Sequence, residues 1–157
     1  MANVQSMCTS FKKEILCGSH ALGIQAANGT RTVTAADVIK AALYLTTASP
    51  GKGAATVDYN VTGEVSGAGY SAGGVVVTNA NAPTATGTTA FWTPSASIVY
   101  SNVTLTNAFN CVVLYNESST AKLAISVHTF GDQTVTAGNF TLTMPTNDAS
   151  TGLVRIA

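Results

Sequence analysis

Two histidines, His20 and His128, are the groups in this chain best suited to act as a general base near neutral pH. Catalysis would need one of them beside a nucleophile or a carboxylate. His128 falls on an expected strand, opposite the apolar residues, where a histidine that faces solvent or another subunit is the favoured interpretation. His20 follows the expected end of a helix, and the same interpretation applies to it.

Seven carboxylates are candidates for the acid and base of a glycosidase or an esterase. They are well separated along the chain, and most fall in expected turns, where such residues solvate or cap the backbone. The seven are Glu14, Asp37, Asp58, Glu64, Glu117, Asp132 and Asp148. We therefore expect no catalytic residues and a protein that is not an enzyme.

A glycine-rich stretch between Gly67 and Gly74 superficially resembles a nucleotide-binding loop. It has one residue too many for GxGxxG and lacks the Lys-Ser/Thr of a P-loop, and the chain contains no GxSxG nucleophile elbow. A loop that needs positive φ values and a close backbone approach before a strand explains these glycines. We expect no cofactor.

The three cysteines, Cys8, Cys17 and Cys111, show neither a CxxC pair nor Cys/His ligand spacing. No metal site is therefore expected. Their odd number favours buried thiols in a chain that folds in a reducing cytoplasm. Pairing of Cys111 with Cys8 or Cys17 stays open at this point.

Charged residues are few and balanced: the chain is 46% hydrophobic and 9% charged, with 7 Lys and Arg against 7 Asp and Glu. Such scattered charges do not match a nucleic acid or an anionic membrane, so neither is an expected partner. We expect no signal peptide and no membrane span. A surface of hydroxyls and amides suits contacts with other subunits, because desolvating these groups costs less than desolvating charges.

Apolar residues recur at helical spacing from Met7 to Cys17, which predicts one short amphipathic helix. Gly18 is expected to end it in a left-handed conformation. A helix this short is not stable alone, so Phe11 and Ile15 must pack on the rest of the chain or on a neighbouring subunit. The candidates for its N-cap are Ser6, Thr9 and Ser10.

Beyond the helix, frequent threonine and turn signals about every ten residues predict short strands. Leu123, Ile125 and Val127 alternate with small or polar residues, which predicts one core-facing side. The expected strands are Val38–Thr46, Gly74–Thr78, Ala96–Thr106, Cys111–Asn116, Lys122–Phe130, Asn139–Met144 and Leu153–Ile156. The pattern predicts a mainly β fold, an antiparallel β-sandwich resembling a jelly roll, with one short N-terminal helix and extended loops or arms.

The whole chain, residues 1–157, is expected to form a single β-sandwich domain, with an N-terminal helical segment at 1–20 and a loop or arm at 21–37. Three small, polar and aperiodic stretches are expected to be loops or arms that become ordered on a neighbour. They are Gln25–Thr34, Gly51–Ala55 and Asn79–Ala90. Another loop is expected at Gly131–Gln133.

Several motifs stand in a characteristic order along the chain. They are the opening Met7-Cys8-Thr9-Ser10-Phe11-Lys12, followed by Gly18 and His20; Ala41-Ala42-Leu43-Tyr44; Gly63-Glu64-Val65-Ser66-Gly67; Gly69-Tyr70-Ser71-Ala72-Gly73-Gly74; Gly138-Asn139-Phe140-Thr141-Leu142; and Leu153-Val154-Arg155-Ile156. As a set they resemble a family of small structural proteins of tailed bacteriophages, which includes head-decoration and tail-associated proteins.

The resemblance implies a non-catalytic virion protein, made in the bacterial host cytoplasm. The short chain and neutral surface favour a head decoration, or cement, protein on the capsid surface, which binds the major capsid protein and itself, with a trimer expected. The alternative is a tail or head-fibre component that recognises host glycans through Trp92 and Tyr70. The expected interface residues are Phe11, Ile15, Leu16 and Trp92, together with the arm Gln25–Thr34.

Overall fold

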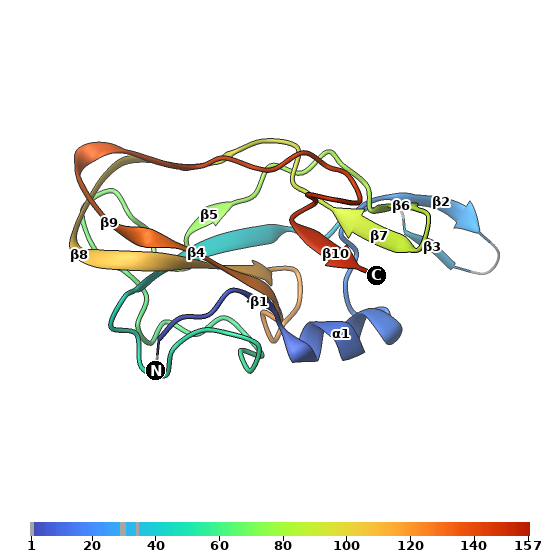
Figure 1. The fold of residues 1–157 in the computed structure, drawn as a ribbon, viewed down its shortest axis with the longest axis horizontal. Helices are drawn as coiled ribbons and strands as arrows, with labels where there is room; N and C mark the ends of the chain where they lie inside the picture. The colour runs from blue at the N-terminus through green and yellow to red at the C-terminus, as the bar shows by residue number, and fades with distance from the viewer. Residues whose placement is uncertain (1, 29–30, 34) are drawn as a thin grey trace.

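The computed structural model describes residues 2–28, 31–33 and 35–157. The elements are β1 (Ser6–Met7), α1 (Thr9–Leu16), β2 (Gln25–Asn28), β3 (Arg31–Val33), β4 (Ile39–Leu45), β5 (Val75–Val76), β6 (Thr84–Thr86), β7 (Thr89–Trp92), β8 (Ile98–Asn116), β9 (Ala124–Leu142) and β10 (Val154–Ile156). The described strands form antiparallel sheets with the orders β1-β9-β8-β4-β5, β10-β7-β6 and β2-β3. The prediction of a mainly β, sandwich-like antiparallel fold with one short N-terminal helix is confirmed (Figure 1).

One long hairpin, β8 with β9, builds both layers of the sandwich. Its two strands pair from Ile98 and Leu142 at the open end to Tyr115 and Ala124 near the tip. Phe140 of β9 is the register partner of Tyr100 of β8. Its ring centroid nevertheless lies 5.0 Å from that of Phe109, which follows Tyr100 by nine residues along β8. Nine extended residues would span about 30 Å. The hairpin therefore doubles back on itself, at the left-hand end of Figure 1.

The bend in the hairpin coincides with irregular pairing. Register shifts occur between Tyr100 and Phe109, and Asn102 and Ala137 have positive φ values. Bulges of this kind add twist and let a strand change direction. The half of the hairpin from Phe109 to its tip joins β4 and β1 in the five-stranded sheet, and the other half lies over one face of that sheet (Figure 1).

The bend corrects the predicted strand boundaries. Ala96–Thr106 and Cys111–Asn116 belong to one strand, β8, and Lys122–Phe130 and Asn139–Met144 fall largely in one strand, β9. The predicted loop Gly131–Gln133 lies inside β9 and is exposed. Turn-forming residues are tolerated there because the strand bends at the edge of its sheet, where their side chains meet solvent.

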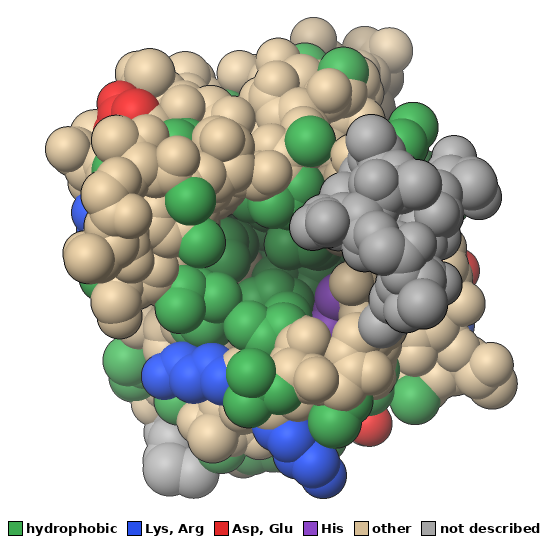
Figure 2. Space-filling view, turned by 90° about the vertical axis from the view of Figure 1, so that its right-hand side faces the viewer, with side chains coloured by type: hydrophobic (Ala, Val, Ile, Leu, Met, Phe, Trp, Pro, Cys, Tyr) green, Lys and Arg blue, Asp and Glu red, His purple; other side chains and the backbone are tan. Residues whose placement is uncertain are grey.

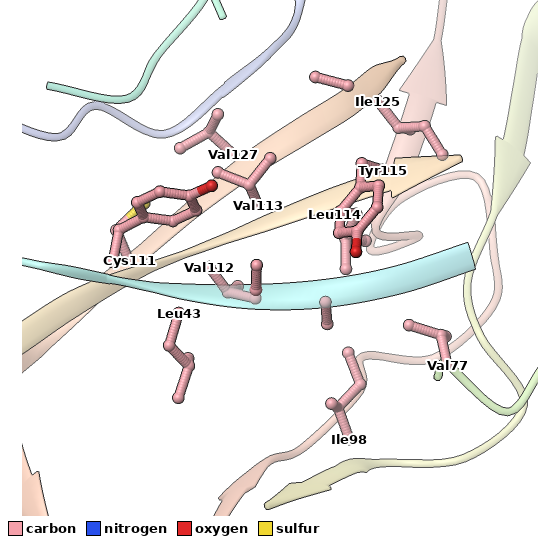
Figure 3. Close-up of a cluster of buried hydrophobic side chains, with 14 of the residues drawn as sticks. Leu43, Val77, Ile98, Cys111, Val112, Val113, Leu114, Tyr115, Ile125 and Val127 are labelled. Carbon is pink, nitrogen blue, oxygen red and sulfur yellow. The ribbon is translucent and has the colours of Figure 1, made fainter. Parts of the chain in front are cut away.

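The predicted core side of the segment Lys122–Phe130 is confirmed by Ile125 and Val127, but the other side is buried as well. Ala124, Ile125, Ser126 and Val127 are all buried in succession. The neighbouring strand β8 is buried on both sides as well, and Figure 3 shows its successive side chains pointing to opposite faces of the sheet. The folded-back half of the hairpin covers one face. The N-terminal segment with Cys8 and the loop after β4 cover the other face.

The helix is shorter than the predicted Met7–Cys17. Met7 is taken into β1, where it pairs with Ser126 of β9. The N-cap is Cys8, which makes no side-chain capping hydrogen bond, so the expected caps at Ser6, Thr9 and Ser10 are wrong. Gly18, with φ of 69°, ends the helix as expected.

Other predicted boundaries shift by a few residues. Val38–Thr46 becomes β4, Leu153–Ile156 becomes β10, and only Val75–Val76 of Gly74–Thr78 is a strand. Two predicted loops contain strands: Asn79–Ala90 includes β6 and part of β7, and Gln25–Thr34 includes β2 and β3. Gly29, Thr30 and Thr34 of the predicted arm lie outside the described residues.

All three cysteines are free thiols. Cys8 and Cys111 are buried as expected, and burial raises the pKa of both thiols to about 12. The expectation of a buried thiol is wrong for Cys17, which is exposed just after the helix. Over the described ranges of the chain, no helix has the length and apolar character needed to cross a bilayer.

Candidate functional site

An apolar pocket opens at the end of the molecule where α1 lies beside the three-stranded sheet. It has a volume of about 180 Å³. Figure 2 shows apolar side chains gathered in this hollow. Its walls come from α1 and the segment after it, from the strands β7 and β10, and from the loop before β6. The lining residues are Phe11, Ile15, His20, Leu22, Pro83, Ala90, Phe91, Trp92, Val154 and Ile156.

The helix contributes the side of the pocket that the sequence predicted to be apolar. Phe11 is buried and Ile15 is half-buried, and both line the pocket. Leu16 points away from the pocket and is 88% exposed. The structure thus brings together Phe11, Ile15 and Trp92 of the four expected interface residues and places Leu16 outside the pocket. Leu16 follows Ile15 by one residue, about 100° around the helix, so the two side chains leave different faces.

The opposite wall is anchored by Trp92, which is only 1% exposed. Its indole N–H donates to Asn79 Oδ1 and to the Asn81 carbonyl, both at 3.2 Å. Asn79 Nδ2 in turn donates to the Leu22 carbonyl at 2.6 Å. The predicted loop 79–90 is therefore tied to the indole and to the segment after the helix, which keeps the pocket walls in a defined position.

A polar network lies under the helix side of the pocket. His20 Nε2 lies 2.9 Å from Glu14 Oε2, and Asn116 Nδ2 lies 3.3 Å from His20 Nδ1. These partners fit a neutral imidazole that donates from Nε2 and accepts at Nδ1. Asn116 Nδ2 also donates to Asp37 Oδ2, which accepts from the Ala21 N–H as well. The network joins the helix end to β8 and to the segment just before β4, and it holds the ring edge-on to Phe11, at 4.8 Å between ring centroids.

Sequence reasoning missed most of the pocket lining. Leu22, Pro83 and the pair Val154 and Ile156 are far apart in sequence, and no local pattern links these three places. The one available signal was the apolar pair Val154 and Ile156 at a spacing of two, because such residues share one face of a strand. That signal predicts a strand, but it does not show which other elements contact this face of the strand.

A second polar cluster surrounds Glu64, a residue that is 8% exposed. Its carboxylate is the centre of the cluster. It accepts hydrogen bonds from the hydroxyls of Tyr59 and Tyr70, both at 2.7 Å, and from the Gly73 N–H at 2.8 Å. Burial, and then the hydrogen bond to Glu64, raise the pKa of both tyrosines. These phenols stay protonated and donate. The cluster fixes the segment 59–74 on the sheet, which is a structural role.

The arrangement closest to a catalytic pair is Ser126 with His128, where Oγ and Nε2 are 2.9 Å apart. Burial lowers the pKa of His128 to about 4, so the ring is neutral at pH 7. Ser126 is only 3% exposed, and in the described part of the chain no carboxylate hydrogen-bonds to the His128 ring to orient it. Across the same residues, no group of three or more His, Cys, Asp and Glu side chains could hold a metal ion.

The aromatic residues considered for glycan stacking are buried or half-buried, and both are engaged in contacts within the chain. Trp92 is buried, and the Tyr70 hydroxyl is bonded to Glu64 while its ring packs on Tyr100 at 6.0 Å. A sugar platform needs an open ring face.

Comparison with family models, curated proteins and solved structures finds no match for this chain.

Proposed function

We propose that this protein is a non-catalytic structural subunit of a tailed-bacteriophage virion, a head decoration protein that binds the major capsid protein and other copies of itself. The observation that carries the proposal is the apolar pocket between α1 and the β10-β7-β6 sheet. The sequence resemblance and the small number of charges support it as well.

The pocket is suited to receive an apolar side chain of a capsid subunit. Its volume of about 180 Å³ is close to that of one large side chain, and ten residues line it, of which nine are apolar. Moving a Leu or Phe side chain from water into such a site is worth about 1.5–3 kcal/mol. Repeated at every copy on a capsid, this contact would oppose the internal pressure of packaged DNA without any chemical step.

The pocket contact is tested with variants on its partly exposed rim. Ile15→Gln combined with Ile156→Gln makes the lining polar, while the buried Phe11 and Trp92 stay in place. We expect co-sedimentation with empty capsid shells to weaken at least about tenfold, since two apolar contacts are lost. Leu16→Gln, on the same helix but outside the pocket, is the matched control and should bind as the parent protein does.

Loss of binding in Leu16→Gln with normal binding of the double variant would transfer the contact to the outer face of the helix and overturn the pocket assignment. The cementing role itself is tested by heating particles with and without the protein. We expect DNA release at a lower temperature without it, and equal release temperatures would remove that role.

A further inference from the structure

The two sides of the sandwich differ in whether their strand edges are covered. The β8 side is largely covered: β4 pairs with the half of β8 near the hairpin tip, and the loop 66–70 lies against residues 102–105 of the other half. The Thr104 N–H donates to the Ala68 carbonyl at 2.8 Å. A Cβ at Gly67 would lie 2.0 Å from the Thr104 oxygen, which shows how closely the two backbones approach.

The β9 side is open. β1 pairs only with Ser126 and Val127, so the outer edge of β9 is free from residue 128 to 142. Over the described residues, this stretch has no backbone pairing other than that with β8. The bulge at Ala137 divides the free edge into two runs. Both runs lie on the same side of the sandwich, since they belong to the two stacked halves of the hairpin (Figure 1).

An apolar cavity lies between the two runs. It has a volume of about 160 Å³, and residues from both layers line it. Phe130, Leu142 and Met144 on its walls are only partly buried. The side therefore offers a partner both unpaired backbone groups and apolar surface. The full lining is Ile98, Val112, Leu114, His128, Thr129, Phe130, Leu142, Thr143, Met144 and Leu153.

Apart from the bulge at Ala137, the free edge carries little of what usually prevents strands from pairing. Natural proteins protect such edges with Lys, Pro or inward-pointing charges. Residues 128–142 contain a single charged side chain, Asp132, and neither Lys nor Pro. A nearly neutral edge has no preference for a charged partner and no like-charge penalty against a second copy of itself.

We propose that two copies of this chain associate about a two-fold axis through the free edges of β9, residues 128–142, which pair antiparallel and close the cavity between the layers. The lengths of the free strand edges favour two-fold over three-fold symmetry. A three-fold ring would pair the β9 edge with a different edge of similar length. Among the described strands, the other free edges are short: those of β1, β2, β3, β5, β6 and β10, which are two to four residues long, and the stretches of β8 that neither β4 nor the loop 66–70 covers.

This inference specifies the self-association of the proposed function, and it gives a pair where the sequence led us to expect a trimer. It does not depend on the capsid contact, because the cavity on the β9 side and the pocket beside α1 share no lining residue. Association of the purified chain and its binding to capsid shells can therefore fail separately.

The test is the mass of the purified chain in solution, measured by sedimentation equilibrium over a range of concentrations. We expect a monomer–dimer equilibrium that reaches twice the chain mass of 15.9 kDa. Hydrogen exchange at the highest concentration should show added protection within residues 128–142. The chain mass alone at all concentrations, a three-fold mass, or added protection confined to other strands would overturn the proposal.

A pair of lysines on the edge provides the variant. Thr134 and Thr136 are exposed on β9, and Thr134→Lys with Thr136→Lys should raise the dimer dissociation constant at least about tenfold, because edge lysines must be desolvated on pairing. Thr84→Lys with Thr86→Lys is the matched control, since it adds the same charges to the exposed edge strand β6. Equal effects of the two double variants would contradict the β9 assignment. Hydrogen exchange of the parent chain decides the question even where the edge variant does not fold.

Discussion

At the scale of single residues, the buried side chain of Glu64 is the centre of a polar cluster. Three donors converge on it from Tyr59, Tyr70 and Gly73. Tyr115 extends the cluster, since its hydroxyl donates to the Gly73 carbonyl and its ring stacks on Tyr59. A buried charge is tolerated when its hydrogen-bonding capacity is filled in this way. Glu64 is thus a structural residue in a chain with few charges.

Glu64→Gln should destabilise the fold by about 2 kcal/mol, because hydrogen bonds to a charged acceptor are stronger than those to an amide. The free energy of unfolding in urea measures this. Glu117→Gln is the control: Glu117 makes a 3.4 Å ion pair with the partly exposed Lys122, and such pairs contribute at most about 1 kcal/mol. An effect at Glu64 no larger than at Glu117 would show that the cluster is not a structural centre.

His128 predicts a pH dependence of stability. Burial lowers its pKa from 6.5 to about 4 in the folded protein. Between these two pH values the unfolded chain therefore binds a proton at His128 that the folded chain does not bind. Stability is complete above pH 6.5 and falls as the pH drops from 6.5 to about 4, by at most about 3 kcal/mol.

Urea unfolding at pH 7, 6, 5 and 4 (about one-unit steps) measures this loss. His128→Gln should remove most of the slope, whereas His20→Gln should keep the contribution of His128. An unchanged slope in His128→Gln would assign the pH dependence to other groups.

At the scale of elements, close backbone packing explains why the glycine-rich stretch before β5 has its composition. Gly74 has φ of 70°, and a Cβ there would lie 1.7 Å from the Ala41 oxygen of β4. The expectation from sequence, positive φ with close backbone approach before a strand, is confirmed at this position. The stretch brings β5 against β4 and covers β8, so its glycines decide which edges of the sandwich are closed.

Gly74 and Gly87 have similar positive φ values but differ in the space around an added Cβ. Comparing substitutions at the two positions therefore separates backbone strain from steric clash. Gly87 has φ of 60° and no atom within 4 Å of an added Cβ. Gly87→Ala should therefore cost about 1 kcal/mol, the penalty for a left-handed Ala. Gly74→Ala should cost several times more, because the Cβ meets a carbonyl. Thermal unfolding compares the two variants, and equal losses would mean that the backbone at Gly74 moves away at little cost.

At the scale of the whole molecule, the scarcity of charge and the two apolar openings set the kind of contact that the two proposed interfaces would make. The formal net charge is zero, and 9% of the residues are charged. The pocket beside α1 and the cavity on the β9 side are both lined mainly by apolar groups. Contacts made through such surfaces depend on apolar burial rather than on charge attraction.

Self-association should accordingly be insensitive to salt. We expect the dimer dissociation constant to change less than about threefold between about 0.05 and 0.5 M NaCl, since one charged residue lies on the pairing edge. Sedimentation at several ionic strengths measures it. A tenfold weakening at high salt would indicate ion pairs across the interface and would point to a different surface.

Local patterns in the sequence determined the class of the fold and much of its placement. The helical spacing around Phe11 and Ile15 predicted the helix, and β-branched residues between turn signals predicted the strands near β4, β9 and β10. These patterns act over a few residues, so they are visible without the fold. They also identified Phe11, Ile15 and Trp92, three of the residues that line the pocket.

Only the tertiary structure shows which faces of these elements are buried and which strand edges are paired. Leu123, Ile125 and Val127 predicted one buried face, but the hairpin bends over the sheet and buries both. Ile156 and Ile15 line the same pocket, and the edge of β9 is free. Both features also depend on that bend and on the order of the strands in the sheets. Local residue spacing limits backbone conformation, whereas burial and edge pairing depend on contacts between distant segments, which no local pattern contains.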